Sequence, residues 1–124
     1  MVVAAILASI LSAKGAEVSR IQDADKFCGD VLSAISHNQL RKAVDMIAGT
    51  TGQPDSASAL LSGLNLLDGK NFDFTKKVFD KDFNGALRQI VYYSYVDNLG
   101  FLYFRFNFKM TSTGFILSNF KLYV

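Results

Sequence analysis

The chain has 124 residues, of which half are hydrophobic and 19% are charged, and its formal net charge is +2. This length suits one domain and is too short for two ordinary ones, and the composition is that of a folded protein. The basic residues are scattered along the sequence, which argues against nucleic acid as a partner. The single cysteine, Cys28, excludes an intramolecular disulfide.

An apolar run, VVAAILASILSA, occupies residues 2–13. It is shorter than the ~20 residues that cross a bilayer as a helix, and it suits the hydrophobic region of a secretory signal peptide. Small residues at Ala13 and Gly15 offer cleavage sites. We therefore expect residues 1–15 to be a signal peptide and residues 16–124 to form one periplasmic or secreted domain without a membrane span. The basic start of a signal peptide is missing, and the run could instead begin an internal helix.

Apolar residues recur at helical spacing in three further segments, which predicts helices over residues 23–36, 40–49 and 57–67. Asp55 or Ser56 is expected to cap the third helix, and His37 to cap carbonyls at the end of the first. Cys28 falls on the apolar stripe of the first helix, where a thiol is a small buried hydrophobe rather than a nucleophile. The adjacent Gly29 weakens this helix and suggests the close approach of another element.

The aromatic residues gather in the second half of the chain, where fifteen of the sixteen lie between Phe72 and Tyr123. They alternate with polar residues between glycine-containing turns, which predicts strands over residues 74–82, 87–97, 101–111 and 115–123. Asn84-Gly85 is a preferred pair for a two-residue hairpin. The N-terminal helices would pack on the apolar face of a curved four-stranded antiparallel sheet, so the expected fold class is α+β.

The turns indicate the register of the strands. A loop at residues 112–114 sets Thr111 opposite Phe115, and the inward set is then Leu102, Phe104, Phe106, Phe108, Met110, Ile116, Phe120 and Leu122. In the preceding hairpin, a loop at residues 98–100 would point Tyr93 and Tyr95 outward and point inward Ile90, Tyr92, Ser94 and Val96. A loop one residue longer or shorter would reverse this assignment.

This order of elements resembles the NTF2-like superfamily, a cone of curved sheet wrapped over helices. The resemblance is carried by LRQIVYYSYVDNLGFLYFRFNFKMTSTGFILSNFKLYV, three long aromatic strands that end the chain, and by the helical pattern FCGDVLSAISHNQLRKAVDMI. It covers most of the chain after residue 20 and is one of pattern and order. The usual short strand between the second and third helices is missing, which leaves open a cystatin-like sheet with fewer helix contacts.

The resemblance implies several possible functions, because the superfamily includes isomerases, dehydratases, polyketide cyclases, transport factors and assembly domains of secretion systems. Its catalytic members hold an Asp or His inside the cone to move a proton. The polar candidates on the inward face are Tyr92, Ser94, Ser118 and Arg88, and none of them is such a base. Asp30 is the one carboxylate that could turn toward a pocket from the first helix. We therefore expect no catalytic residue, and with one histidine in the chain we expect no metal site and no cofactor.

Two surfaces are candidate sites. A pocket between the helices and the sheet would be lined by Phe27, Asp30, Val31, Tyr92, Ser94, Phe104 and Phe106. The outer sheet face has the residue types of an interface, namely Tyr93, Tyr95, Tyr103, Arg105 and Tyr123. We expect a non-catalytic binding or assembly domain that forms a homodimer through this face, with a small apolar ligand or an envelope protein as a further partner. The alternative is a small isomerase, dehydratase or cyclase with a hydrophobic pocket.

Overall fold

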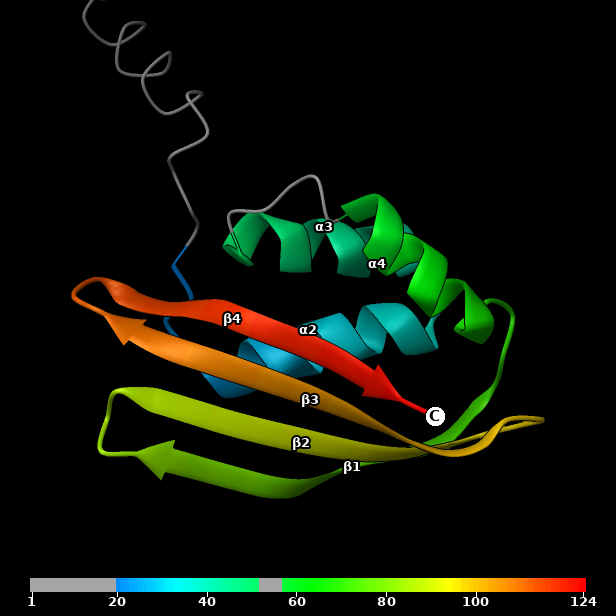
Figure 1. Ribbon diagram of the computed structural model, residues 1–124. Helices are drawn as coiled ribbons and strands as arrows, with labels where there is room; N and C mark the ends of the chain where they lie inside the picture. The colour runs from blue at the N-terminus through cyan, green and yellow to red at the C-terminus, as the bar shows by residue number, and fades with distance from the viewer. Residues whose placement is uncertain (1–19, 52–56) are drawn as a thin grey trace, which may run out of the picture.

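The computed structural model describes residues 20–51 and 57–124 (Figure 1). The helices are α2 (Ala24–Ser36), α3 (Leu40–Thr51), α4 (Ala57–Leu64) and the short 3-10 helix η2 (Asn65–Leu67). The strands that follow are β1 (Phe72–Phe83), β2 (Leu87–Val96), β3 (Gly100–Thr111) and β4 (Gly114–Tyr123). The α+β fold class is confirmed, whereas the expected signal peptide and the expected cap at Asp55 or Ser56 lie outside the described residues.

Helix α2 begins and ends at residues with hydrogen-bonding side chains. At its start, the Asp23 carboxylate accepts a hydrogen bond from the backbone N–H of Lys26 at 3.0 Å. At its end, the ring Nδ1 of His37 lies 2.7 Å from the carbonyl oxygen of Ser33. Asn38 then adopts a left-handed conformation, with φ of 62°, which turns the chain toward α3. The predicted capping role of His37 is confirmed.

Helix α3 continues past Gly49, where the sequence predicted its end. The Thr50 hydroxyl donates a hydrogen bond to the carbonyl of Ile47 at 2.9 Å, and the Thr51 hydroxyl donates one to the carbonyl of Ala48 at 3.3 Å. Threonine hydroxyls can donate hydrogen bonds to carbonyls one turn earlier in a helix. The carbonyls of the last turn accept no hydrogen bond from within the helix, so such bonds are useful there. The predicted end of this helix at Gly49 was therefore two residues too early.

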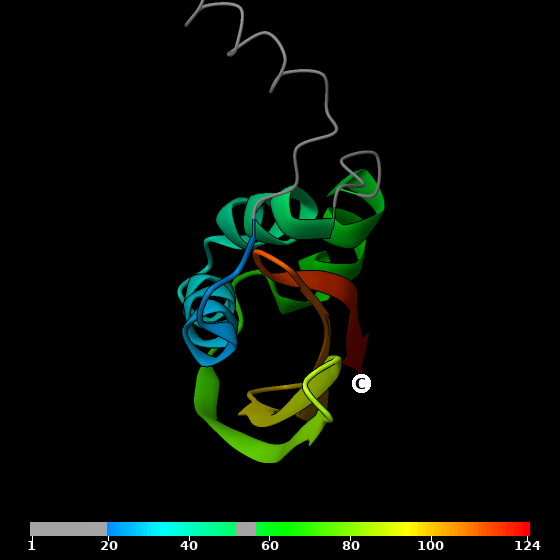
Figure 2. The same ribbon diagram turned by 90° about the vertical axis from the view of Figure 1, so that its left-hand side faces the viewer.

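The four strands form one antiparallel sheet in the order β1-β2-β3-β4, so each strand pairs with its neighbours in the sequence. The sheet curves around the helices, which all lie on one side of it (Figure 2). Its inner face is therefore concave and carries the core. Its outer face is convex, and no described helix or strand covers it.

The pairing of β2 with β3 confirms the predicted faces of β2. Ile90, Ser94 and Val96 are completely buried on the inner side, and Tyr93 lies on the outer side. The connecting loop spans residues 97–99, one position earlier than predicted. This change moves the partner of each β2 residue by two positions along β3, and a shift of two leaves every side chain on its predicted face.

The pairing of β3 with β4 differs from the prediction near the turn. Thr111 lies opposite Gly114 rather than Phe115, so the register there is one residue away from the expected one. Farther from the turn the predicted pairing is found, with Phe106 opposite Phe120. A β-bulge between these two regions absorbs the extra residue.

The bulge changes which β4 side chains face the core. The Ser118 hydroxyl donates a hydrogen bond to the carbonyl of Asn107 at 3.0 Å, and Ser118 is exposed. Leu117 is buried opposite Phe108, where the predicted register placed Ser118. Met110, also predicted to point inward, keeps the alternation of β3 and lies opposite Phe115, but it is 46% exposed near the end of the strand. The prediction failed on β4 because the bulge reverses the alternation of faces on that strand, and it has no glycine or proline to mark it.

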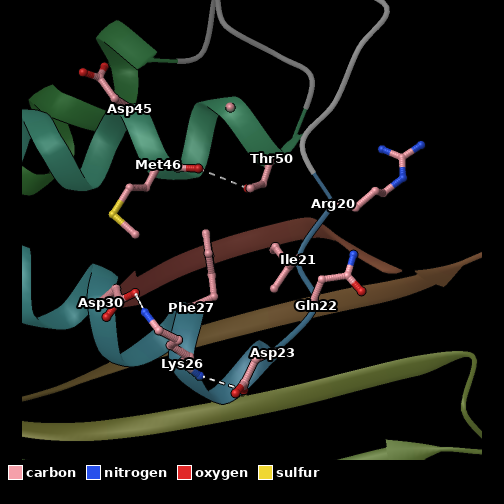
Figure 3. A pocket seen from close by; sticks show the side chains of 11 residues that line it. Arg20, Ile21, Gln22, Asp23, Lys26, Phe27, Asp30, Asp45, Met46 and Thr50 are labelled. Carbon is pink, nitrogen blue, oxygen red and sulfur yellow. Dashed lines mark hydrogen bonds and ion pairs between the residues drawn. The ribbon is translucent and has the colours of Figure 1, made fainter. Parts of the chain in front are cut away.

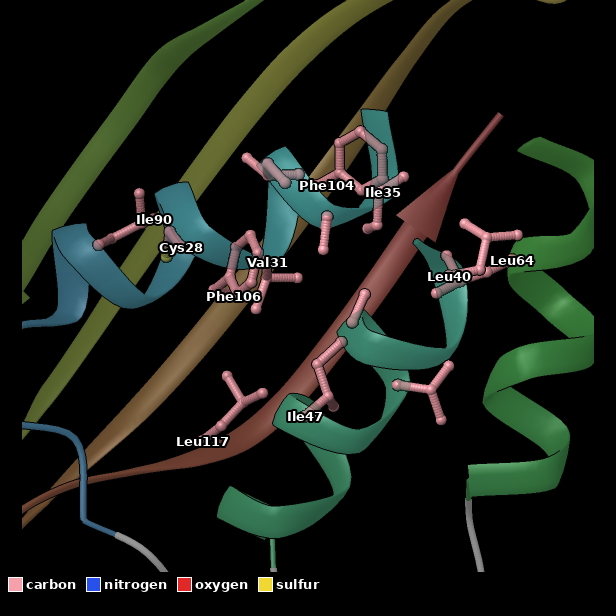
Figure 4. Packing of buried hydrophobic residues seen from close by; sticks show 14 of the residues in the cluster. Cys28, Val31, Ile35, Leu40, Ile47, Leu64, Ile90, Phe104, Phe106 and Leu117 are labelled. Carbon is pink, nitrogen blue, oxygen red and sulfur yellow. The ribbon is translucent and has the colours of Figure 1, made fainter. Parts of the chain in front are cut away.

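Aromatic rings from β3 meet the apolar side of α2 in one core (Figure 4). Phe104, Phe106 and Phe108 have no accessible surface. Cys28 is equally buried, and this burial raises the pKa of its thiol far above the usual range, which confirms its structural role. A side chain at Gly29 would meet nothing within 4 Å, so the expected close approach at this glycine was wrong.

Candidate functional site

The residues predicted to line a pocket are not brought together around one. Four of the seven have no accessible surface: Val31, Ser94, Phe104 and Phe106. No space that admits a water molecule therefore adjoins their side chains, and they belong to the core. The Ser94 hydroxyl is satisfied there by a hydrogen bond of 2.8 Å with the hydroxyl of Thr75.

Phe27 and Asp30 line a separate, open hollow of about 470 Å³ between α2 and α3 (Figure 3). The ring of Phe27 packs edge-on against Phe108, with 6.1 Å between ring centroids. Asp30 forms an exposed ion pair with Lys26 at 2.8 Å. The hollow thus has an apolar floor, to which Met46 contributes, and a solvated charged rim on which Asp30 is neutralised.

Tyr92, the remaining pocket candidate, lines a crevice where α2 faces β1 and β2. Gly29 and Ser33 contribute the helix side of this crevice. Burial raises the pKa of Tyr92 to about 12, so its hydroxyl is protonated at neutral pH. It forms no hydrogen bond with any residue in the described ranges, and it remains a donor without a base beside it.

A network of four charged side chains joins α2 to β1 and β2 at the edge of the inner face. Lys77 lies 2.6 Å from Asp25 and 2.9 Å from Asp80. Arg88 reaches the same two carboxylates, at 3.0 Å from Asp25 and 2.8 Å from Asp80. Its hydrogen bond to Asp80 is the main reason that the pKa of this carboxyl falls to about 2.

This network could not be predicted from the sequence because β1 contains a bulge. Lys77 and Asp80 are three residues apart, a spacing that would place them on opposite faces of a regular strand. The register shift between Lys77 and Phe79 brings both to the inner face. Only the alternation of opposite charges in the sequence hinted at such pairing.

The carboxylates of this network differ from those that act as general bases. Asp25 and Asp80 are each paired with two cations, and these pairs hold the pKa of both carboxyls below the usual range. General bases near neutral pH have raised rather than lowered carboxyl pKa values. No group of three or more metal-binding side chains occurs in residues 20–51 and 57–124.

Six of the aromatic residues on the outer face form one cluster, here called the aromatic patch: Phe74, Tyr93, Tyr95, Phe101, Tyr103 and Tyr123. Tyr93 lies 4.7 Å from Tyr103 and 5.0 Å from Phe101, measured between ring centroids. Phe101 is 53% exposed and Tyr103 is 43% exposed. Exposed aromatic clusters of this kind mark contact sites.

This patch unites the residues predicted for an interface. Four of the five belong to it, and Arg105 lies beside it with its guanidinium 5.4 Å from the ring of Tyr123. Phe74 and Phe101 were not predicted as members. The signal that finds them is the register, since both lie directly opposite Tyr95 on the neighbouring strands.

The same face gathers five cations, here called the outer cations: Lys76, Lys81, Arg105, Lys109 and Lys121. None of them forms an ion pair with a carboxylate among the residues described. Among the residues of the four strands that pair across the sheet, no Asp or Glu points to the outer face. Asp73 lies in a bulge of β1 and is not paired with a residue of β2. The sequence positions are scattered, but the pleat of the sheet collects them on one side.

Among the outer cations, Arg105 is partly buried and contacts a neighbouring side chain. One of its terminal nitrogens donates to the Asn119 side chain at 3.2 Å, and its Nε is buried without a hydrogen-bond partner. Lys121 lies directly opposite Arg105 on β4, and like charges in that position are destabilising. The two cations therefore form a spot of unneutralised charge beside Tyr123.

Comparison of the chain with known protein families, characterised proteins and solved structures gave no significant match. The NTF2-like relationship therefore stays a prediction, and the α+β architecture stands on the structure alone. Across the described part of the chain, no helix combines the length and apolar character needed to cross a bilayer.

Proposed function

We propose that this chain is a non-catalytic binding domain of the cell envelope or the extracellular space, and that it makes contact through the outer face of its sheet. The aromatic patch carries the proposal, because Phe101, Tyr103 and their neighbours are exposed in one cluster rather than scattered singly. The filled inner face and the neutralised carboxylates support a binding role over catalysis.

The homodimer predicted from the sequence is one form of this contact. The charges on the face argue against it. A symmetric dimer would bring the outer cations of two copies together, and no carboxylate among the cross-strand pairs of this face would separate them. A partner of opposite charge fits the face better than a second copy does.

The proposal is tested by photocrosslinking in the cell. A photoreactive phenylalanine analogue is placed at position 103, and in a matched protein it replaces the exposed Lys42 of α3. We expect site-specific products from position 103 and none from position 42. Equal labelling from the two positions, or no product from position 103, would contradict the proposal. A product of twice the 13.7 kDa mass of the chain would identify the homodimer.

A further inference from the structure

We infer that the outer face binds a bilayer surface that contains anionic phospholipids. The inference rests on the proposed function and names the partner of the same surface. Charge is its first support. The inward cations Lys77 and Arg88 are each bound to two carboxylates, whereas the outer cations have no carboxylate partner among the described residues. Phosphate headgroups supply the missing negative charge.

The types of side chain on this face are the second support. Tyrosine is enriched where proteins meet the headgroup region of a membrane, and lysine and arginine are attracted to anionic lipids there. The aromatic patch contains four of the five tyrosines of the chain. Four of the five outer cations are lysine, a residue that is depleted in interfaces between proteins.

The shape of the face is the third support. The sheet is convex on this side (Figure 2), and its cations are spread over β1, β3 and β4 instead of following one track. None of the described hollows is lined by Tyr93, Phe101 or Tyr103. A broad surface of small charged headgroups needs no groove, whereas a bound polymer is usually held along one.

Single-stranded nucleic acid fits the face less well, although its charge is suitable. Bases bind such proteins by stacking on free aromatic ring faces. Tyr93 and Phe101 instead stack on each other, with ring centroids 5.0 Å apart and an angle of 13° between the planes. Each ring therefore covers one face of its neighbour, and a base cannot stack on that face.

The test is sedimentation of the full chain with vesicles of phosphatidylcholine, alone or with about 30% phosphatidylglycerol. The readout is the difference between the two vesicles, because the apolar run at residues 2–13 favours both alike. We expect binding that is at least about 10-fold stronger on the anionic vesicles and that weakens as salt is raised. Equal binding to the two vesicles would overturn the inference.

Charge reversal locates the contact. The double variant R105E/K121E is expected to lower the affinity for anionic vesicles by about 30-fold or more, since each basic residue near such a surface contributes about 5-fold. The matched control R41E/K42E makes the same change of charge on the exposed side of α3 and is expected to stay within about 2-fold of the wild type. Equal losses from the two double variants would show an effect of net charge and overturn the inference.

Arg105 is partly buried, so R105E could impair folding, and a second variant is needed that changes only exposed residues. K76E/K109E changes two fully solvated positions on the same face and is expected to weaken anionic binding to a similar extent. Binding of a fluorescent single-stranded oligonucleotide without a preference for anionic vesicles would replace the lipid by nucleic acid. Crosslinks from position 103 without vesicle binding would refute the lipid partner alone, whereas the absence of both would refute the proposed function as well.

Discussion

At the scale of single residues, the carboxyl of Asp80 links β1 to β2 through ion pairs. It binds Arg88 through two hydrogen bonds, at 2.8 and 2.9 Å, and binds Lys77 at 2.9 Å. Asp25 extends these contacts to α2. Because β1 is an edge strand with no fully buried residue, these ion pairs add to the few apolar contacts of the strand.

Replacing Asp80 by Asn tests this role. We expect the substitution to lower the free energy of unfolding by about 1–2 kcal/mol at pH 7, since the pair is only partly exposed. The contribution is fully present above the ordinary pKa of 3.8 and is lost as the pH falls through the folded value of about 2. The gap between the two proteins should therefore close in acid.

Urea unfolding at several pH values measures this gap. Asp73→Asn is the matched control, because Asp73 lies exposed on the same strand and forms no ion pair with a described residue. A loss for Asp80→Asn that matched the control, or that stayed constant down to pH 2, would refute the role given to Asp80.

At the scale of elements, the bulge in β4 decides which apolar side chain completes the core. Leu117 is 1% exposed and lies opposite Phe108, whereas Ile116 lies opposite Lys109 on the outer side. The regular alternation expected from the sequence would reverse these two positions. The two residues are adjacent and similar in size, so each serves as the control for the other.

We expect Leu117→Ala to reduce the free energy of unfolding by about 3 kcal/mol, because it removes a buried side chain and leaves a cavity. Ile116→Ala should cost about 1 kcal/mol or less, because its side chain lies on the solvent side. Denaturant unfolding of the two variants measures the difference. The opposite order would show that the strand keeps its unbulged register.

Strand positions and most faces could be predicted because they follow from local patterns. Ile90, Ser94 and Val96 alternate with tyrosines along β2. Their faces stay the same whenever their partners on β3 shift by an even number of residues, as they do here. The bulges at Val78 and Ser118 could not be predicted, because an extra residue in a strand leaves no fixed sequence mark. Each bulge changed the prediction on its own strand, at the ion-pair network and at Leu117.

The candidate site was predicted in part for the same reason. Tyr93, Tyr103 and Arg105 were assigned to the outer face because they alternate with core residues. The charge of that face could not be seen in the sequence, where Lys76 adjoins Lys77 and acidic residues follow. Pairing of the strands separates Lys76 from Lys77, one facing out and the other in. The argument from scattered basic residues therefore failed at the level of the sheet.

At the scale of the whole molecule, the two faces of one sheet have different tasks. The inner face joins α2 and α3 in a core without space for water beside Phe104 or Phe106, and it provides the stability of the fold. The outer face presents the aromatic patch and the outer cations to solvent. We therefore regard the inner face as the structural part of the molecule and the outer face as its contact surface.

Tyr103 and Phe104 are neighbours on β3 and point to opposite faces, so they offer the most direct test of this division. We predict that Phe104→Ala lowers the free energy of unfolding by about 3–5 kcal/mol, through the lost burial and the cavity left behind. Tyr103→Ala should lower it by about 1 kcal/mol, the value of its contacts with neighbouring rings. Urea unfolding of the two variants is the measurement. Losses of equal size would contradict the account, since they would make the aromatic patch a part of the core.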